Sequence, residues 1–208
     1  NVISDNVISG KYTYEAMLLG DFSYGTVTGN AFYLDNPTVT TSGIMLSSHE
    51  SGSPTSSRSV GNIISGNTIR VASSLSAGAS IVGIIGISLF TIGAYGPENN
   101  VVSDNSIIGT GNFKTVCVFI NANRNVIRNN SIVWSGNSIA NQHGMTFYVE
   151  AGGVCKDNSI SGNTMDGVTG IGFYFSNLCG RQTISGNTIL NCGSHGIFND
   201  SGTCNGSL

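Results

Sequence analysis

Charge is scarce in this chain. Lys and Arg together number 8 among 208 residues, Asp and Glu number 11, and only 9% of the residues are charged, with a formal net charge of −3. A protein that binds nucleic acid neutralises backbone phosphates with clustered Lys and Arg. So few cations in a net acidic chain indicate that nucleic acid is not a partner.

Helical periodicity is also missing. Glycine is frequent, β-branched residues are dense, and apolar residues do not recur with a 3.6-residue period. Residues 77–96 carry no charge, and this run is long enough to raise the question of a membrane span. Its Gly and Ser content and the alternation of Ile87, Leu89 and Thr91 favour a buried strand instead. We therefore expect no membrane span.

What the chain does contain is a short phrase that recurs seven times. Each copy is an apolar strand, a corner that ends in asparagine, and a second apolar strand. The corner asparagines are residues 6, 30, 67, 105, 130, 163 and 187, with Gly, Asp or Asn before each. Gly, Asp and Asn tolerate the left-handed backbone region that a sharp corner needs. A shortest spacing of 24 residues that is only ever lengthened predicts one repeated unit with inserted loops.

A unit this short has room for three strands and none for a crossover helix. The arrangement that fits is a coil whose strands stack in parallel on the next coil, roughly 4.8 Å away. The sequence therefore predicts an all-β fold, a right-handed parallel β-helix of about seven coils, forming a single domain over residues 1–208. The seven asparagines should form a column. Neither terminus resembles a cap, so we expect a fragment of a longer chain, uncapped at one or both ends.

The phrase resembles the parallel β-helix repeat of pectate-lyase-like proteins, bacteriophage tailspikes and capsule depolymerases. Copies such as Ile63–Ile69 and Ile184–Ile189 carry the resemblance, which extends from residue 1 to about residue 200. It implies a bacterial capsular or O-antigen polysaccharide as partner, a homotrimer, and a location on a virion tail or elsewhere outside the cell. Because the repeat is a packing motif, it says more about the fold than about the activity.

Acidic residues gather at the corner after the third strand of each unit. Asp21, Glu50 and Glu98 lie there, with His49 beside Glu50. Glycosidases use two carboxylates about 5 Å apart for retention or about 6.5–9.5 Å apart for inversion, distances that stacked coils can supply. We therefore predict a catalytic pair, either Asp21 with Glu50 or Glu50 with Glu98, in which His49 tunes one carboxylate. The alternative is that these are solvated turn residues.

Alternation in the third strand predicts a partly aromatic stripe on the outside. Tyr148, Tyr174 and Phe198 are expected at equivalent positions of three successive coils. Such a ladder could stack sugar rings or form the contact of a homotrimer. His143 and Glu150, at the two ends of the same strand, complete the predicted substrate-binding residues.

Two other functions stay open. His143 and His195, each before a glycine, could combine with Tyr148, Glu150 and Arg181 in a polysaccharide lyase, where they would remove a proton and neutralise a uronate. The paired-Asp calcium pattern of pectate lyases is not apparent, so we expect no metal and no cofactor. The other alternative is a non-catalytic trimeric fibre shaft or adhesin segment.

Cysteine spacing matches no zinc signature. Cys155 and Cys179 are one 24-residue repeat apart, and we expect them to stack as buried thiols on adjacent coils.

Overall fold

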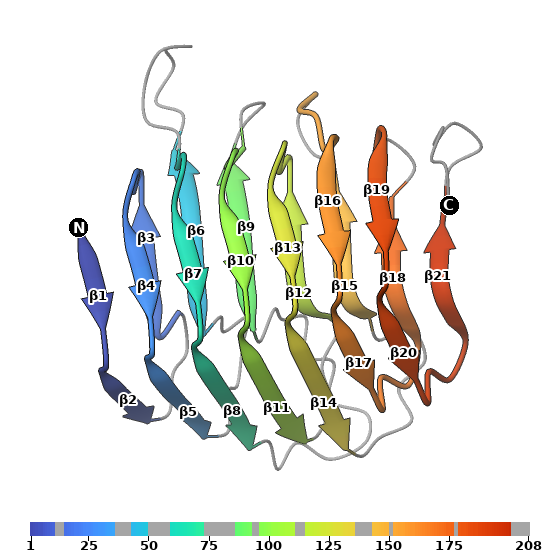
Figure 1. Cartoon of the computed structure of the whole chain (residues 1–208), viewed down its shortest axis with the longest axis horizontal. Coiled ribbons are helices and arrows are strands. Elements are labelled where there is room, and N and C mark those ends of the chain that lie inside the picture. The colour runs from blue at the N-terminus through green and yellow to red at the C-terminus, as the bar shows by residue number, and fades with distance from the viewer. Residues whose placement is uncertain are drawn as a thin grey trace.

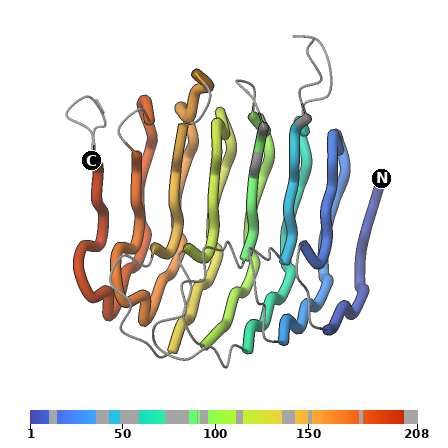
Figure 2. The backbone as a smooth tube through the Cα atoms, turned by 180° about the vertical axis from the view of Figure 1, so that it is seen from behind, coloured from blue at the N-terminus to red at the C-terminus, as the bar shows by residue number. Residues whose placement is uncertain are grey.

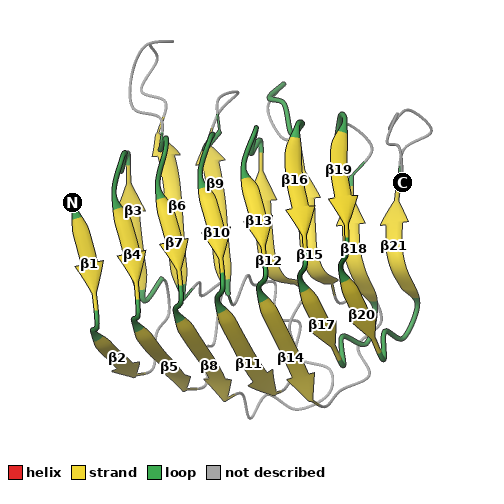
Figure 3. Cartoon of the chain, viewed as in Figure 1, coloured by secondary structure: helices red, strands yellow, loops and turns green. Residues whose placement is uncertain are grey.

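The computed structural model describes residues 1–10, 15–35, 43–49, 59–72, 86–92, 96–110, 115–135, 143–149, 152–176 and 179–200. Every regular element within these residues is a strand, and the strands form three seven-stranded sheets, named A, B and C below. Neighbouring strands pair in parallel throughout, as Figures 1 and 3 show. The predicted all-β parallel β-helix of about seven coils is confirmed.

Each coil contributes one strand to each sheet. Sheet A contains β1 (Val2–Ser4), β4 (Thr26–Thr28), β7 (Ile63–Ser65), β10 (Val101–Ser103), β13 (Val126–Arg128), β16 (Asn158–Ser161) and β19 (Gln182–Ser185). Sheet B contains β2 (Val7–Gly10), β5 (Ala31–Asp35), β8 (Thr68–Ala72), β11 (Ser106–Thr110), β14 (Ser131–Ser135), β17 (Thr164–Asp166) and β20 (Thr188–Leu190). Sheet C contains β3 (Met17–Gly20), β6 (Ile44–His49), β9 (Ile87–Ile92), β12 (Thr115–Ile120), β15 (His143–Tyr148), β18 (Ile171–Phe175) and β21 (His195–Asn199).

The chain passes from sheet A through a sharp corner into sheet B and returns through sheet C (Figure 1). Strands pair in register from coil to coil, so that Ile3, Val27 and Ile64 are successive neighbours in sheet A. Figure 2 shows from behind that the first and last coils lie at opposite ends of the stack. Side chains at matching positions therefore form columns along the stack.

The predicted asparagine column is confirmed and runs through all seven corners between sheets A and B. At each step the backbone N–H and the side-chain Nδ2 of one asparagine both donate to Oδ1 of the next, over 2.9–3.1 Å. We call this the first column; its members are Asn6, Asn30, Asn67, Asn105, Asn130, Asn163 and Asn187. Its five inner members are buried, and paired buried amides of this kind hold neighbouring coils in register.

A second column, which the sequence analysis missed, lines the corner between sheets C and A. The same donor pattern joins its members over 2.9–3.2 Å, and Gly25 N–H donates into its first member. Its members are Asn62, Asn100, Asn125, Asn158 and Gln182. Each lies five positions before a member of the first column, as Asn62 does before Asn67. That constant spacing was the available signal.

The corners owe their shape to the residue before each column member. At all seven corners of the first column this residue has a positive φ of 54–68°. The residues are Asp5, Gly29, Gly66, Asp104, Asn129, Gly162 and Gly186. Glycine reaches this region without steric cost, and Asp and Asn reach it more readily than other side chains. The corner chemistry expected from the sequence is therefore the chemistry observed.

Apolar side chains from all three sheets fill the inside of the coils. Phe119, Phe147 and Phe175 stack on successive coils of sheet C, with ring centroids 4.7 and 4.8 Å apart. Cys117 is buried among this core, and burial raises the pKa of its thiol to about 12. Close packing of this kind leaves no space for a ligand inside the coils, so any ligand must meet the outside of the stack.

The charge-free run forms part of the core. Strand β9 lies within it, and Ile87, Leu89 and Thr91 are all buried, as predicted. No helix in the described part of the chain is long and apolar enough to cross a membrane.

Gly180 N–H donates to the Cys155 carbonyl over 3.0 Å, which places Cys179 beside Cys155 on the adjacent coil, and both are buried free thiols.

Candidate functional site

Three stacked rings mark the outward face of sheet C at its C-terminal end. The His143 ring lies 4.5 Å from the Tyr174 ring at an angle of 9°, and Tyr174 lies 5.9 Å from Phe198 at 13°. Because His143 and Phe198 belong to the coils on either side of Tyr174, both faces of the Tyr174 ring are covered. A ligand therefore meets ring edges and polar atoms here.

The predicted equivalence of Tyr148 with Tyr174 and Phe198 is wrong. Tyr174 pairs with Phe198 and with Thr146, whereas Tyr148 pairs with Ile120. That prediction requires Gly144 of β15 to be level with Gly170. In the structure His143 pairs with Ile171 and Met145 with Phe173, so Gly144 is level with Gly172 instead. Tyr148 therefore lies two positions after Thr146 on β15, where it is 41% exposed.

Polar groups surround the stacked rings. The Tyr174 hydroxyl donates to Asp200 Oδ2 over 2.9 Å, and partial burial, followed by this carboxylate, raises the pKa of Tyr174. Tyr174 is thus a protonated donor at neutral pH and is unsuited to act as a base. His143 Nδ1 lies 3.1 Å from Thr146 Oγ1, which in turn lies 2.9 Å from Thr115 Oγ1. Asp200 was missing from the predicted binding residues.

Aliphatic side chains in the middle coils of the outward stripe are buried. Met45 and Val118 share the column of Thr146 and Tyr174, and Ile120 shares that of Tyr148. All three aliphatic residues are less than 9% exposed. The accessible side chains of the described outward face are therefore Leu18 of β3, which is 56% exposed beside Met45, and the aromatic and polar ones of β15, β18 and β21.

The structure does not bring the described carboxylates of the predicted catalytic set together. Asp21 is exposed directly after β3, and its N–H donates to the Ser47 carbonyl over 2.8 Å, which aligns Asp21 with Ser48. Glu98 lies further along its coil, where it pairs with Val60 and Asn123 in isolated bridges. Two of the other predicted residues, Glu50 and Glu150, lie outside the described residues, as does the His49 side chain.

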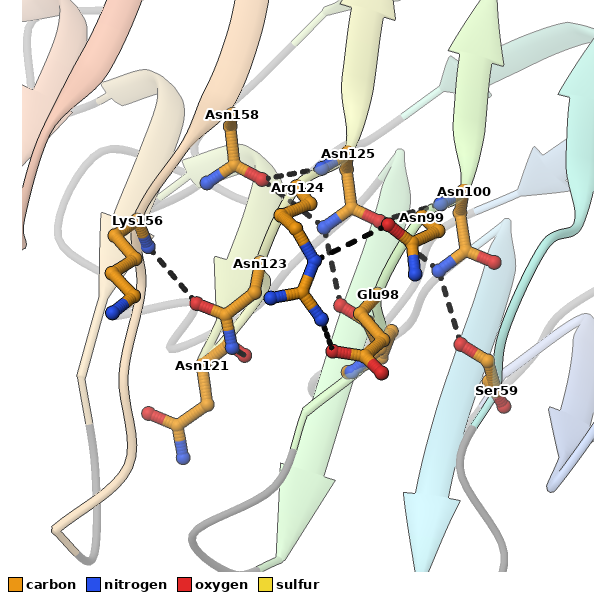
Figure 4. A network of polar contacts seen from close by, with 11 residues as sticks. Ser59, Glu98, Asn99, Asn100, Asn121, Asn123, Arg124, Asn125, Lys156 and Asn158 are labelled. Carbon is orange, nitrogen blue, oxygen red and sulfur yellow. Dashed lines mark hydrogen bonds and ion pairs between the residues drawn. The ribbon is translucent and has the colours of Figure 1, made fainter.

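Glu98 belongs to a polar network at the corner between sheets C and A (Figure 4). Its carboxylate lies 2.6 Å from Arg124 Nη2, and the Lys156 N–H donates to Asn123 Oδ1 on the next coil. Arg181 pairs in the same way with Asp157 over 2.7 Å. The arginine that the lyase hypothesis assigned to substrate therefore holds a carboxylate of its own corner.

A separate hollow lies on the outward face of sheet B, at the ends of β5, β8 and β11. It has a volume of about 350 Å³ and is lined by Tyr33, Leu34, Asp35, Arg70, Val71, Ala72, Ile108, Gly109 and Thr110. The sequence analysis did not single out these residues, because they come from three copies of the repeat. Exposed and buried positions alternate along each of these strands, which places every second residue on the outside.

Metal binding finds no support in the described ranges, where no three His, Cys, Asp or Glu side chains gather as ligands.

No family model matches the chain, and no curated protein matches it. Among solved structures, the chain is similar to the crystal structure of PfbA, a surface adhesin of Streptococcus pneumoniae, with 11% identity and a TM-score of 0.44. The similarity covers 94% of this chain and 63% of that one, and we draw no functional conclusion from it.

Proposed function

We propose that this β-helix binds an extracellular glycan along the outward face of sheet C. The observation that carries the proposal is the His143–Tyr174–Phe198 stack with Asp200 hydrogen-bonded at its edge. Sugars combine apolar C–H faces with hydroxyls that both donate and accept, and this surface offers partners for both. The low charge of the whole chain fits a ligand recognised by hydrogen bonds more than by charge.

Each accessible residue has a distinct part in this proposal. Tyr148, at 41% exposure, offers ring surface for a sugar to pack against. Asp200 accepts hydrogen bonds from sugar hydroxyls with the oxygen that Tyr174 does not use. Matching groups on successive coils suit a ligand with a repeating structure, as a polysaccharide has.

Binding assays on capsular polysaccharide and O-antigen preparations test this proposal. Calorimetry should give a saturable isotherm, and Tyr174→Ala and Tyr148→Ala should each weaken binding by about tenfold or more, or roughly 1.4 kcal/mol. Leu190→Ala, an exposed apolar residue on sheet B, is the matched control and should bind like the parent protein. Wild-type affinity in both tyrosine variants would remove sheet C as the binding face.

Cleavage of the bound polysaccharide, as by a tailspike glycosidase, is the second candidate function. The observation that favours it is Asp21, an exposed carboxylate directly after β3 with a positive φ of 51°. Glu50, with Glu98 and His49 as further candidates, completes the pair proposed from the sequence. Reducing-sugar release should fall at least 100-fold in Asp21→Asn and Glu50→Gln. Equal release from both variants and the parent would discard this pair, and an unsaturated uronate product would assign a lyase.

A location on a virion tail or the cell exterior, and a homotrimeric state, complete the proposal. Both derive from the resemblance of the repeat to tailspikes. Light scattering of the purified chain should give three times the mass of one chain. A monomer that still binds polysaccharide would leave the glycan proposal intact and would favour an adhesin segment over a trimeric tailspike.

A further inference from the structure

The hollow on sheet B is built from three successive coils. Tyr33, Arg70 and Ile108 pair in register as one outward row, and Asp35, Ala72 and Thr110 form the next row. These positions alternate with buried ones along each strand, so both rows face away from the core. Figure 1 shows that sheet B lies apart from sheets A and C, so this surface is separate from the ring stack of sheet C.

Small residues keep the hollow open. Ala72 stands between Asp35 and Thr110 in its row, and Gly109 lies between Ile108 and Thr110 on β11, at one side of the floor. A Cβ added at Gly109 would lie 2.3 Å from the ring of Trp134, because that buried indole extends beneath β11. The floor is thus rigid and closely packed, with the single tryptophan of the chain directly under it.

The polar groups of the hollow have no partners in the described part of the protein. Arg70 and Asp35 make neither an ion pair nor a hydrogen bond with any described residue, and both are exposed. Tyr33 is 44% exposed and Ile108 38% exposed beside them. Two other exposed arginines, Arg124 and Arg181, are instead paired with carboxylates of neighbouring coils. This hollow therefore keeps an aromatic ring, a cation and an anion available to a ligand.

We propose that the hollow is a second carbohydrate-binding site that takes an uncharged hexopyranose residue. The C–H face of the sugar packs on the Tyr33 ring, Asp35 accepts hydrogen bonds from its hydroxyls, and Arg70 donates to them. A volume of about 350 Å³ is at the lower end of the range for small-ligand pockets, which suits one sugar ring with its substituents.

Charge decides between neutral and acidic sugars. The guanidinium and the carboxylate cancel, so the site offers no net attraction to an anion, and Asp35 repels the carboxylate of a uronate. Hydroxyls satisfy both groups, since each can donate to Asp35 or accept from Arg70. An apolar ligand would leave both groups desolvated and unpaired, which disfavours it.

Trp134 provides the readout. A sugar in the hollow lies above the Gly109 floor and should change the tryptophan fluorescence, whereas a ligand on sheet C should leave it unchanged. Methyl α-D-glucoside, methyl α-D-mannoside, methyl β-D-galactoside and D-galacturonate are titrated into the purified full chain. We expect a saturable change with at least one neutral glycoside, with a dissociation constant on the order of 1 mM for one small ring.

Variants at the hollow make the assignment specific. Tyr33→Ala and Arg70→Met should each raise the dissociation constant at least tenfold, while Leu190→Ala on the same sheet and Tyr174→Ala on sheet C should not change it. Unchanged circular dichroism and thermal midpoints establish that each variant folds. No saturable response to any neutral glycoside, a tighter response to galacturonate, or a response that survives both hollow variants would each overturn the proposal.

The oligomeric state provides a further test of the hollow. If the chain is a trimer whose mass falls to that of one chain in Tyr33→Ala, the hollow is a subunit contact and the sugar proposal fails. Tyr174→Ala should weaken binding at sheet C and leave binding at sheet B unchanged. Failure of the proposed function and failure of the hollow as a sugar site are therefore distinguishable results.

Discussion

The two asparagine-lined corners of each coil are alike on the inside and different on the outside. At the corner between sheets A and B, the residue before each column member is Gly, Asp or Asn in all seven coils. At the corner between sheets C and A, the residues before the four column asparagines are Gly61, Asn99, Arg124 and Asp157, all with positive φ, whereas Arg181 before Gln182 is not in this region. Here Arg124 and Asp157 make the ion pairs with Glu98 and Arg181.

This difference separates the buried amides, which stabilise the stack, from the outer corner residues, which contribute little to its stability. Both columns satisfy buried amides in the same geometry, whichever residues precede them. The outer residue of the second corner is free to vary in size and charge, because the buried amide behind it fixes the backbone. The columns should therefore dominate stability, and the outer residues should be replaceable at low cost.

The largest expected effect is the loss of a central amide from either column. Asn105→Ala removes the acceptor for both Asn67 donors, and Asn100→Ala does the same to Asn62. Each should lower the free energy of unfolding by about 3–5 kcal/mol, since buried donors are left unpaired. Urea denaturation measures both values. A loss at Asn100 below half of that at Asn105 would show that the two columns are not equivalent.

A smaller loss is expected at the end of the first column. Asn187 accepts from Asn163 over 2.9 Å but is only half-buried, so water can replace part of what it provides. Asn187→Ala should cost about 1–2 kcal/mol in the same urea experiment. A cost equal to that of Asn105→Ala would mean that burial along the column does not set its strength.

At alkaline pH the contribution of the Cys117 thiol to stability should change, whereas the contributions of the column amides should not. The raised pKa of Cys117, about 12, means that its stabilising contribution is complete below pH 9 and is lost as pH rises through 12. Between pH 8 and pH 10 this thiol should account for about 1.4 kcal/mol of lost stability, which Cys117→Ala should abolish. The penalties of Asn105→Ala and Asn100→Ala should not change over this range, because amides do not titrate. A pH-dependent penalty would contradict that.

The smallest effect is expected outside the second corner. Arg124 is 52% exposed in its pair with Glu98, so Arg124→Ala should change the free energy of unfolding by less than about 1 kcal/mol, and less still at high salt. Arg124→Lys is the matched control for charge. A loss as large as that of Asn187→Ala would show that this ion pair carries structural weight.

The architecture was readable from the sequence because the corner repeats its chemistry. Asn6 to Asn187 could be aligned by eye, and each alignment marks a coil. The second column is equally regular, since Asn158 and Gln182 stand five positions before Asn163 and Asn187, but the residue before each member ranges from glycine to arginine, so no constant corner phrase marks it. Local turn chemistry is visible in sequence; a buried amide without a distinctive neighbour is not.

The outward faces were less predictable, because register there depends on segments of unequal length. An incorrect alignment of one glycine predicted Tyr148 in the column of Tyr174, whereas Thr146 is the residue that pairs with Tyr174. Glu98 lies beside Asn123 at the predicted corner after sheet C, but Asp21 is level with Ser48 directly after β3, so the two carboxylates are not at matching positions. The hollow of Tyr33, Asp35 and Arg70 draws on the second strands of different repeats, whose outward residues follow no common pattern, so only the coil-to-coil register reveals it.

Each column hydrogen bond described above joins a coil to its immediate neighbour. Such a chain is modular: duplicating or deleting one complete repeat would recreate the same junctions without disturbing distant ones. Evolution or design can therefore change the length of this protein in whole turns. A ligand track laid along its outer surface would grow or shrink by the same increments.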